Sequence, residues 1–163
     1  MNASTRAALV APLLILPMLL AGCAPTIVLE PAADAADPAC AAVSVRLPDA
    51  VAGLSKRQTN AQATAAWGEP AHVILRCGVP APSPTAILPC VTVPDPNGVD
   101  WLRDSSGAPF FVFTTYGRQP ALEVIIDGTE VSGLDVLTEL AGAVSQLPVE
   151  GRCIGLGDLG TSG

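Results

Sequence analysis

The chain has 163 residues and carries 15 acidic side chains against eight lysines and arginines, a formal charge of −7 at pH 7. A nucleic acid binds through cations that neutralise its phosphates, so this balance argues against nucleic acid as a partner. It equally argues against attachment to anionic lipid headgroups by charge alone.

Residues 1–22 have the layout of a secretory signal, with one cation, Arg6, ahead of an apolar run over 7–20. The run is short for a helix that crosses a membrane. Pro12 and Pro17 also interrupt it, and prolines inside a helix remove backbone hydrogen bonds. We therefore expect this segment to be cleaved from the mature protein.

The stretch Leu20-Ala21-Gly22-Cys23 resembles the bacterial lipobox. The resemblance implies that the Cys23 thiol takes a diacylglyceryl group and that the chain is cut before it, which makes 1–22 a lipoprotein signal peptide. Two or three acyl chains anchor a protein stably, because each buried methylene contributes about 0.8 kcal/mol. A secreted protein with an incidental cysteine is the alternative. We expect a lipid anchor on the extracytoplasmic face of the cell membrane.

Removal of 1–22 leaves 141 residues with a formal charge of −8, which is enough for one domain. We expect this domain over 38–153, with a flexible tether over 23–37 and a flexible tail over 154–163. The alternative for part of the tether is an edge strand at 27–29, where Ile, Val and Leu follow one another.

Besides Cys23, the chain has an even number of cysteines, which in an exported protein favours two disulfides: Cys40, Cys77, Cys90 and Cys153. The residues alone leave all three pairings open, and free thiols are the alternative. The chain has no C-x-x-C motif and a single histidine, His72, so we predict no metal site and no cofactor.

Asp37 and Pro38 are typical of a helix start, and we expect this helix to run to Leu47, just before Pro48. Spacings of three and four place a set of its residues on one core-facing stripe: Cys40, Val43 and Leu47.

The polar segment 54–64, which contains Lys56 and Arg57, is typical of a solvated loop. A turn at 67–72 then leads into a strand over 73–78. Alternate residues of that strand share one face, which we expect to be the core face: Val73, Leu75 and Cys77. Cys77 is therefore expected to face the same core as Cys40.

Two hairpins are predicted next. The first joins 87–93 to 99–102 through Asn97-Gly98, a pair that adopts the positive φ angles of a tight turn. The second joins 110–115 to 121–126. Its first strand begins Phe-Phe-Val-Phe, apolar on both faces, which predicts the centre of the sheet.

Ser132 is a predicted cap of a final helix that ends before Pro148. Its apolar stripe contains Leu134, Leu137, Leu140, Ala141, Val144 and Leu147. Together these elements predict an α+β domain, with a mainly antiparallel sheet of four or five strands and two packed helices.

The chain contains patterns that suggest catalysis, but each lacks the neighbouring structure that the chemistry needs. Residues 155–160 satisfy G-x-G-x-x-G, but no helix can follow within the chain to receive a phosphate. His72 has no accompanying G-x-S-x-G elbow, so we predict no Ser-His-Asp site. Acidic pairs such as Glu123 with Asp127 lie at element ends, where solvated carboxylates are common. We therefore expect a protein that is not an enzyme.

These observations favour a binding or assembly module of the cell envelope whose partner is an unknown envelope protein or small ligand. The alternative is a solute-binding or enzymatic lipoprotein that clamps an anionic or sugar ligand with Arg57, Trp67, Arg76 and Trp101. A pocket where two of these side chains converge would favour the alternative. An exposed apolar patch would favour assembly.

Five blocks of the chain together resemble the DUF3515 family of uncharacterised actinobacterial envelope proteins: A-C-A-A at 39–42, A-W-G-E-P at 66–70, L-R-C-G-V at 75–79, G-V-D-W-L at 98–102 and V-F-T-T-Y-G-R at 112–118. The resemblance covers most of 38–147. It implies a Cys40–Cys77 disulfide, because both match motif cysteines of the family, and leaves Cys90 and Cys153 for a second bond. It implies location and fold but no activity.

Overall fold

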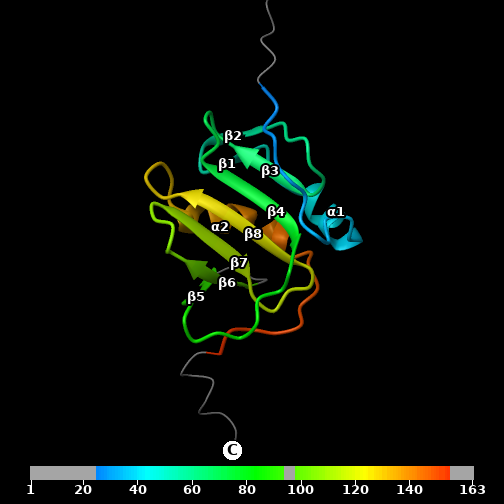
Figure 1. Ribbon diagram of the computed structural model, residues 1–163, viewed down its shortest axis with the longest axis vertical. Helices are drawn as coiled ribbons and strands as arrows, with labels where there is room; N and C mark the ends of the chain where they lie inside the picture. Colours follow the sequence, from blue (N-terminus) through cyan, green and yellow to red (C-terminus); the bar gives the residue numbers. More distant parts are fainter. Residues whose placement is uncertain (1–24, 94–97, 155–163) are drawn as a thin grey trace, which may run out of the picture.

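An eight-stranded antiparallel sheet forms one layer of the protein and two helices form the other (Figure 1). The computed structural model describes residues 25–93 and 98–154. The strands lie side by side in the order β1-β2-β3-β4-β8-β7-β6-β5. In chain order they are β1 (Ala50–Val51), β2 (Leu54–Arg57), β3 (Thr64–Trp67), β4 (Val73–Val79), β5 (Cys90–Val93), β6 (Val99–Asp104), β7 (Phe110–Thr115) and β8 (Ala121–Asp127).

The expectation of four or five strands is wrong, because the polar segment 54–64 is not a single loop. It contributes β2 and the start of β3, which pair with each other through Lys56 opposite Trp67. β3 in turn pairs with β4, so tertiary contacts hold a hairpin whose own residues show no apolar alternation. The two-residue strand β1 extends the edge further, and a strand this short leaves no pattern in the sequence.

Both predicted helices are present, as α1 (Pro38–Ser44) and α2 (Gly133–Val144). The Asp37 carboxylate accepts a hydrogen bond from the Ala39 amide at 2.7 Å, and Ser132 caps α2. Each helix ends three residues earlier than expected, because turns follow Ser44 and Val144. The leucines beyond those ends stay buried: Leu47 and Leu147. Within the described ranges, no helix is long and apolar enough to span a membrane.

The hydrophobic core lies between the helices and one face of the sheet, with α2 behind the sheet in Figure 1. The alternation predicted for β4 is confirmed, since Val73, Leu75 and Cys77 are all buried there. The predicted stripe of α2 is confirmed at Leu137, Leu140, Ala141 and Val144. Leu134 is the exception, because 54% of it is exposed.

Both predicted hairpins are confirmed, as β5 with β6 and β7 with β8. The turn predicted between β5 and β6 falls largely on 94–97, outside the described residues. The centre of the sheet is β4 and β8, and not β7 as the Phe-Phe-Val-Phe run suggested. Phe110 at the start of β7 is 51% exposed. The apolar run therefore does not mark the centre of the sheet.

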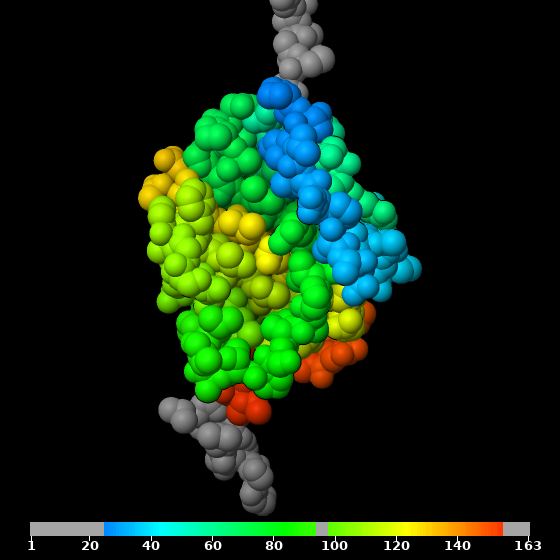
Figure 2. All heavy atoms as spheres, viewed as in Figure 1, coloured from blue at the N-terminus to red at the C-terminus, as the bar shows by residue number. Residues whose placement is uncertain are grey.

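Residues 25–37, expected to be a tether, lie along the sheet from β2 to β4 (Figures 1 and 2). Ile27 forms a single parallel bridge with Thr59, which is less than the edge strand considered as the alternative. Further on, the Asp34 amide donates to the Gly78 carbonyl at 2.9 Å. Gly78 has a φ of +95° and lies so close to the Asp34–Ala35 backbone that a Cβ has no room. Only glycine allows this close passage.

Two disulfides join the pairs that the family resemblance implied. Cys40 and Cys77 lie with Cα atoms 5.6 Å apart and link α1 to the central strand β4, with both residues fully buried. Cys90 and Cys153, with Cα atoms 6.4 Å apart, link the edge strand β5 to the segment that follows α2. Cys90 is exposed to solvent. One bond therefore lies inside the core and the other at the edge of the sheet.

Candidate functional site

Neither described cavity is lined by more than one of the four side chains expected to form a ligand clamp. Trp67 and Trp101 are fully buried in the core. The Trp67 indole donates to the Pro48 carbonyl at 3.2 Å, whereas the Trp101 indole nitrogen has no partner within the described residues. Both tryptophans are therefore core residues and not clamps for a ligand.

The two arginines of the expected clamp are engaged by the fold. Arg57 forms an ion pair with Glu69 and donates to the Gly68 and Pro25 carbonyls at 3.0 Å each. Arg76 on β4 donates to the Glu123 carboxylate on β8 at 2.7 Å. Both guanidinium groups thus stabilise contacts between neighbouring segments.

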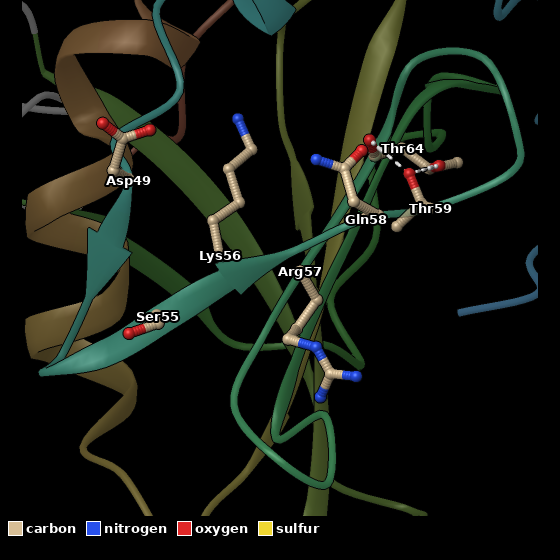
Figure 3. Close-up of a pocket in the computed structure, with 7 residues that line it drawn as sticks. All are labelled: Asp49, Ser55, Lys56, Arg57, Gln58, Thr59 and Thr64. Atoms are coloured by element: carbon tan, nitrogen blue, oxygen red, sulfur yellow. Dashed lines mark hydrogen bonds between the residues drawn. The ribbon is translucent and has the colours of Figure 1, made fainter. Parts of the chain in front are cut away.

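A polar depression of about 470 Å³ lies beside β2 and is lined by Asp49, Ser55, Lys56, Arg57, Gln58, Thr59 and Thr64. Figure 3 shows the Lys56 ammonium extending between Asp49 and Gln58, while the Arg57 guanidinium extends the other way. The Thr64 hydroxyl donates to the Ala61 carbonyl at 2.6 Å and contacts the Thr59 hydroxyl at 2.9 Å. Lys56 is therefore the cation that this depression offers to a solute.

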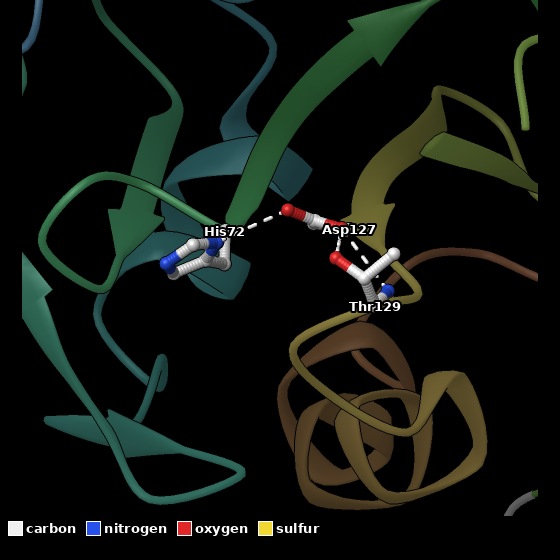
Figure 4. A network of polar contacts seen from close by, with 3 residues as sticks. All are labelled: His72, Asp127 and Thr129. Carbon is white, nitrogen blue, oxygen red and sulfur yellow. Dashed lines mark hydrogen bonds and ion pairs between the residues drawn. The ribbon is translucent and has the colours of Figure 1, made fainter. Parts of the chain in front are cut away.

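His72, Asp127 and Thr129 form a polar network at the end of the sheet where β4 starts and β8 ends (Figure 4). The His72 Nδ1 atom lies 3.2 Å from the Asp127 carboxylate. The Thr129 hydroxyl donates to the same carboxylate at 2.7 Å, and its amide donates at 3.1 Å. These bonds, with a smaller effect of His72, hold the pKa of the Asp127 carboxyl below its usual value.

This network has the wrong connectivity for nucleophilic catalysis. In a Ser-His-Asp site, the hydroxyl bonds to the imidazole nitrogen that does not face the carboxylate. Here the Thr129 hydroxyl bonds to the carboxylate itself, so His72 cannot accept its proton. The geometry instead fixes the loop after β8 to the start of β4, where the Asp127 amide also donates to the His72 carbonyl at 2.9 Å.

Cys90, Cys153 and Asp100 place ligand-type atoms within 4.8 Å of one another, a spacing that could hold a metal. The two sulfur atoms are bonded to each other, however, so neither can act as a thiolate ligand. The Asp100 carboxylate accepts from the Cys153 amide at 2.8 Å and from the Thr92 hydroxyl at 2.6 Å. The cluster therefore serves to hold the segment around Cys153 on the β5–β6 hairpin.

An apolar groove of about 310 Å³ lies between the helix-facing side of β5, β6 and β7 and the start of α2. Apolar side chains and two glycines form most of its wall, with one serine and one arginine: Val91, Arg103, Phe111, Phe113, Gly128, Val131, Ser132, Gly133, Leu134 and Leu137. Gly128 leaves room for the Phe111 ring, because a Cβ at this position would overlap the ring. Among the described cavities, this one has the wall of an apolar binding site.

Local patterns in the sequence predict packing roles for residues of this groove. They predict a central strand at Phe110-Phe111-Val112-Phe113 and a place for Leu134 on the buried stripe of α2. In the structure, Phe111 is half-buried and Leu134 is exposed at the groove. No pattern in the sequence indicates a role for Arg103, because it is a lone arginine in a strand. Its place beside two phenylalanines depends on the β6–β7 register, in which Arg103 lies opposite Phe113.

Eight antiparallel strands covered on one face by two helices define a two-layer domain that is mostly sheet. The chain belongs to the DUF3515 family, described as a protein of unknown function, whose family model matches residues 7–151. Comparison with curated proteins found no match, and comparison with solved structures found none either.

Proposed function

We propose that this protein is a lipid-anchored module on the extracytoplasmic face of the cell membrane, which acts by binding a partner and not by catalysis. The observation that carries the binding function is the apolar groove, where the half-buried Phe111 and the exposed Leu134 face solvent. Exposed apolar surface in a hollow costs solubility, and it marks interaction sites on protein surfaces. Lipidation at Cys23 would hold the groove near the membrane.

The contacts of Pro25 support a short connection between the anchor and the domain. Its carbonyl accepts a hydrogen bond from Arg57, and Ile27 bridges to Thr59, so the chain contacts the domain within a few residues of Cys23. A lipid on Cys23 would then place the domain directly at the membrane surface. The anchor is tested by Cys23→Ala, which should release the protein from membranes. An unchanged mass and membrane location for this variant would contradict the anchor.

The binding function is tested by photo-crosslinking in intact cells. A photoreactive residue at Leu134, in the groove, should give adducts, whereas one at Val45, the C-cap residue of α1, should not. Val45 is the matched control, because it is 78% exposed and lines neither cavity. Equal labelling from both positions, or none from Leu134, would contradict the groove as the binding surface.

A second function has a specific observation in its favour. The polar depression beside β2 offers the Lys56 ammonium and the Asp49 carboxylate together, which suits a small polar solute with both charges. Of the four side chains in the expected clamp, only Arg57 lines this depression. A solute-binding lipoprotein would lose its ligand on Lys56→Ala and keep it on Leu134→Ser, the reverse of what the groove predicts.

A further inference from the structure

We propose that the apolar groove binds a single-chain amphiphile with an anionic head group, whose tail lies on Phe111, Val131 and Leu134 and whose head group pairs with Arg103. The proposal rests on the binding function above and names the class of ligand for the same groove.

The wall of the groove fits an alkyl chain. Six of the ten lining residues have apolar side chains, supplied by β5, β7, the loop after β8, and α2. Phe111 is half-buried and Leu134 is exposed, whereas Phe113 and Leu137 are buried and close the bottom of the groove. A volume of about 310 Å³ is at the lower limit of small-molecule sites, which selects one chain over a lipid with several.

The charge of the groove selects an anionic head group. Arg103 is the single charged residue of the described groove wall. Its side chain is exposed, and within the described residues no carboxylate or carbonyl accepts a hydrogen bond from its guanidinium. A guanidinium presents paired donors whose geometry matches a carboxylate or a phosphate.

Three other arginines, two in strands and one between β7 and β8, have partners within the fold. Arg57 and Arg76 each pair with a glutamate, and Arg118 donates to the Leu147 carbonyl at 2.7 Å. Those three guanidinium groups stabilise the fold. Among these four arginines, only Arg103 lines the apolar groove. It does so in a chain of charge −7, whose 15 acidic side chains offer many possible partners.

The size of the groove favours an amphiphile over a folded protein partner. A stable protein interface uses about 20–30 residues on each side, whereas ten residues line this groove. An amphiphile needs only the hollow and one cation. Because Cys23 would tether the domain to the bilayer, such molecules would also be close at hand.

The test uses the full chain with Cys23→Ala, so that no acyl chain of its own is present. Three probes share one decyl chain and differ in the head group: decanoate, decyltrimethylammonium and decyl maltoside. Each is titrated below its micelle concentration by calorimetry. Decanoate should bind about tenfold or more tightly than decyltrimethylammonium, because a hydrogen bond to a charged group has roughly that effect.

Two substitutions separate the head-group contact from the apolar contact. Arg103→Gln should remove the preference for decanoate and leave decyl maltoside binding unchanged. Leu134→Ser should weaken all three probes, and its exposed position keeps the fold intact. Arg46→Gln, which removes an exposed arginine just after α1 that lines neither cavity, is the matched control and should leave the affinity for all three probes unchanged.

The outcomes distinguish this inference from the function on which it rests. Equal affinity for decanoate and decyltrimethylammonium, or a preference that survives Arg103→Gln, would overturn the head-group assignment. If decyl maltoside still bound and Leu134→Ser weakened it, the groove would remain an apolar binding site. If no decyl probe bound but Leu134 still crosslinked to a protein, the amphiphile would be ruled out and a protein partner would take its place.

Discussion

The two halves of the sheet use the same kinds of residue in different ways. In the β1–β4 half, Arg57 and Arg76 have glutamate partners, and the Trp67 indole has a carbonyl partner. In the β5–β8 half, Arg103 stands exposed beside an apolar groove, and the Trp101 indole nitrogen has no partner within the described residues. The arginines of the first half thus stabilise the fold, whereas Arg103 of the second half is exposed to solvent.

The covering of each half explains this difference. Residues 25–37 and α1 contact the β1–β4 half, and the buried Cys40–Cys77 disulfide holds α1 there. The β5–β8 half is covered by α2, whose first turn leaves the groove open along β7. Its disulfide, Cys90–Cys153, lies at the outer strand. The half with fewer covering segments is the one that carries the candidate binding surface.

The largest effect that tests this comparison concerns the two disulfides. Chain entropy predicts a loss of about 4 kcal/mol for either bond, with the 63-residue separation of Cys90–Cys153 slightly ahead of the 37-residue separation of Cys40–Cys77. Burial predicts the opposite order, because only Cys40 and Cys77 lie fully within the core. We expect Cys40→Ala/Cys77→Ala to cost more than Cys90→Ala/Cys153→Ala, as measured by urea unfolding. The reverse order would favour the entropic account.

A smaller effect is expected where residues 25–37 cross the sheet. Gly78→Ala forces a Cβ against the Asp34–Ala35 backbone at a φ of +95°, so we expect a loss of about 1–3 kcal/mol. The matched control is Gly142→Ala in α2, where the new Cβ meets no atom within 4 Å. There the better helix propensity of alanine should stabilise the protein by about 1 kcal/mol. Two thermal unfolding curves decide whether the crossing is a tight contact.

The arginines of the two halves should differ in what their loss affects. Arg76→Gln removes a partly exposed ion pair, so we expect a loss of about 0.2–1 kcal/mol in unfolding free energy. Arg103→Gln should leave stability within about 0.5 kcal/mol of the parent, because its guanidinium stabilises no described contact. A destabilised Arg103→Gln variant would show that this arginine belongs to the fold after all.

The smallest effect is the pH dependence that arises from Asp127. Because folding lowers the pKa of this carboxyl, its contribution to stability is present above the unfolded pKa of about 3.9 and is lost as the pH falls through the folded value. Thr129→Val removes the hydroxyl bond and should move the folded pKa of Asp127 upward, as seen by NMR titration. An unchanged pKa would mean that the Thr129 amide and His72 are enough to keep the pKa of Asp127 low.

Local sequence patterns predicted the elements whose signals lie within a few residues. Asp37-Pro38 and Ser132 start the helices where capping requires, and the alternation of Val73, Leu75 and Cys77 gives the core face of β4. Each helix ends earlier than its apolar spacing suggests, because that spacing continues into a buried turn. The lipobox at Leu20 to Cys23 remains a prediction, since those residues lie outside the described ranges.

The groove could not be predicted, because its wall comes from strands and a helix that meet only in the folded chain. Arg103 and Phe113 lie opposite each other through the β6–β7 register, and Leu134 joins them from α2. The sequence shows that these residues are charged or apolar, and local periodicity assigned Leu134 to the core. Exposure depends on what packs next to a residue.

The sequence by itself determined the acidic balance, the cysteine count, the helix starts and the two hairpins, since each depends on composition or on neighbours in the chain. The tertiary structure alone decided the eight-strand count and which arginines are engaged. It also decided where the apolar surface stays open. The physical reason is that strand pairing and burial join residues far apart in the chain, as when β4 pairs with β8, and short-range patterns carry no information about such partners.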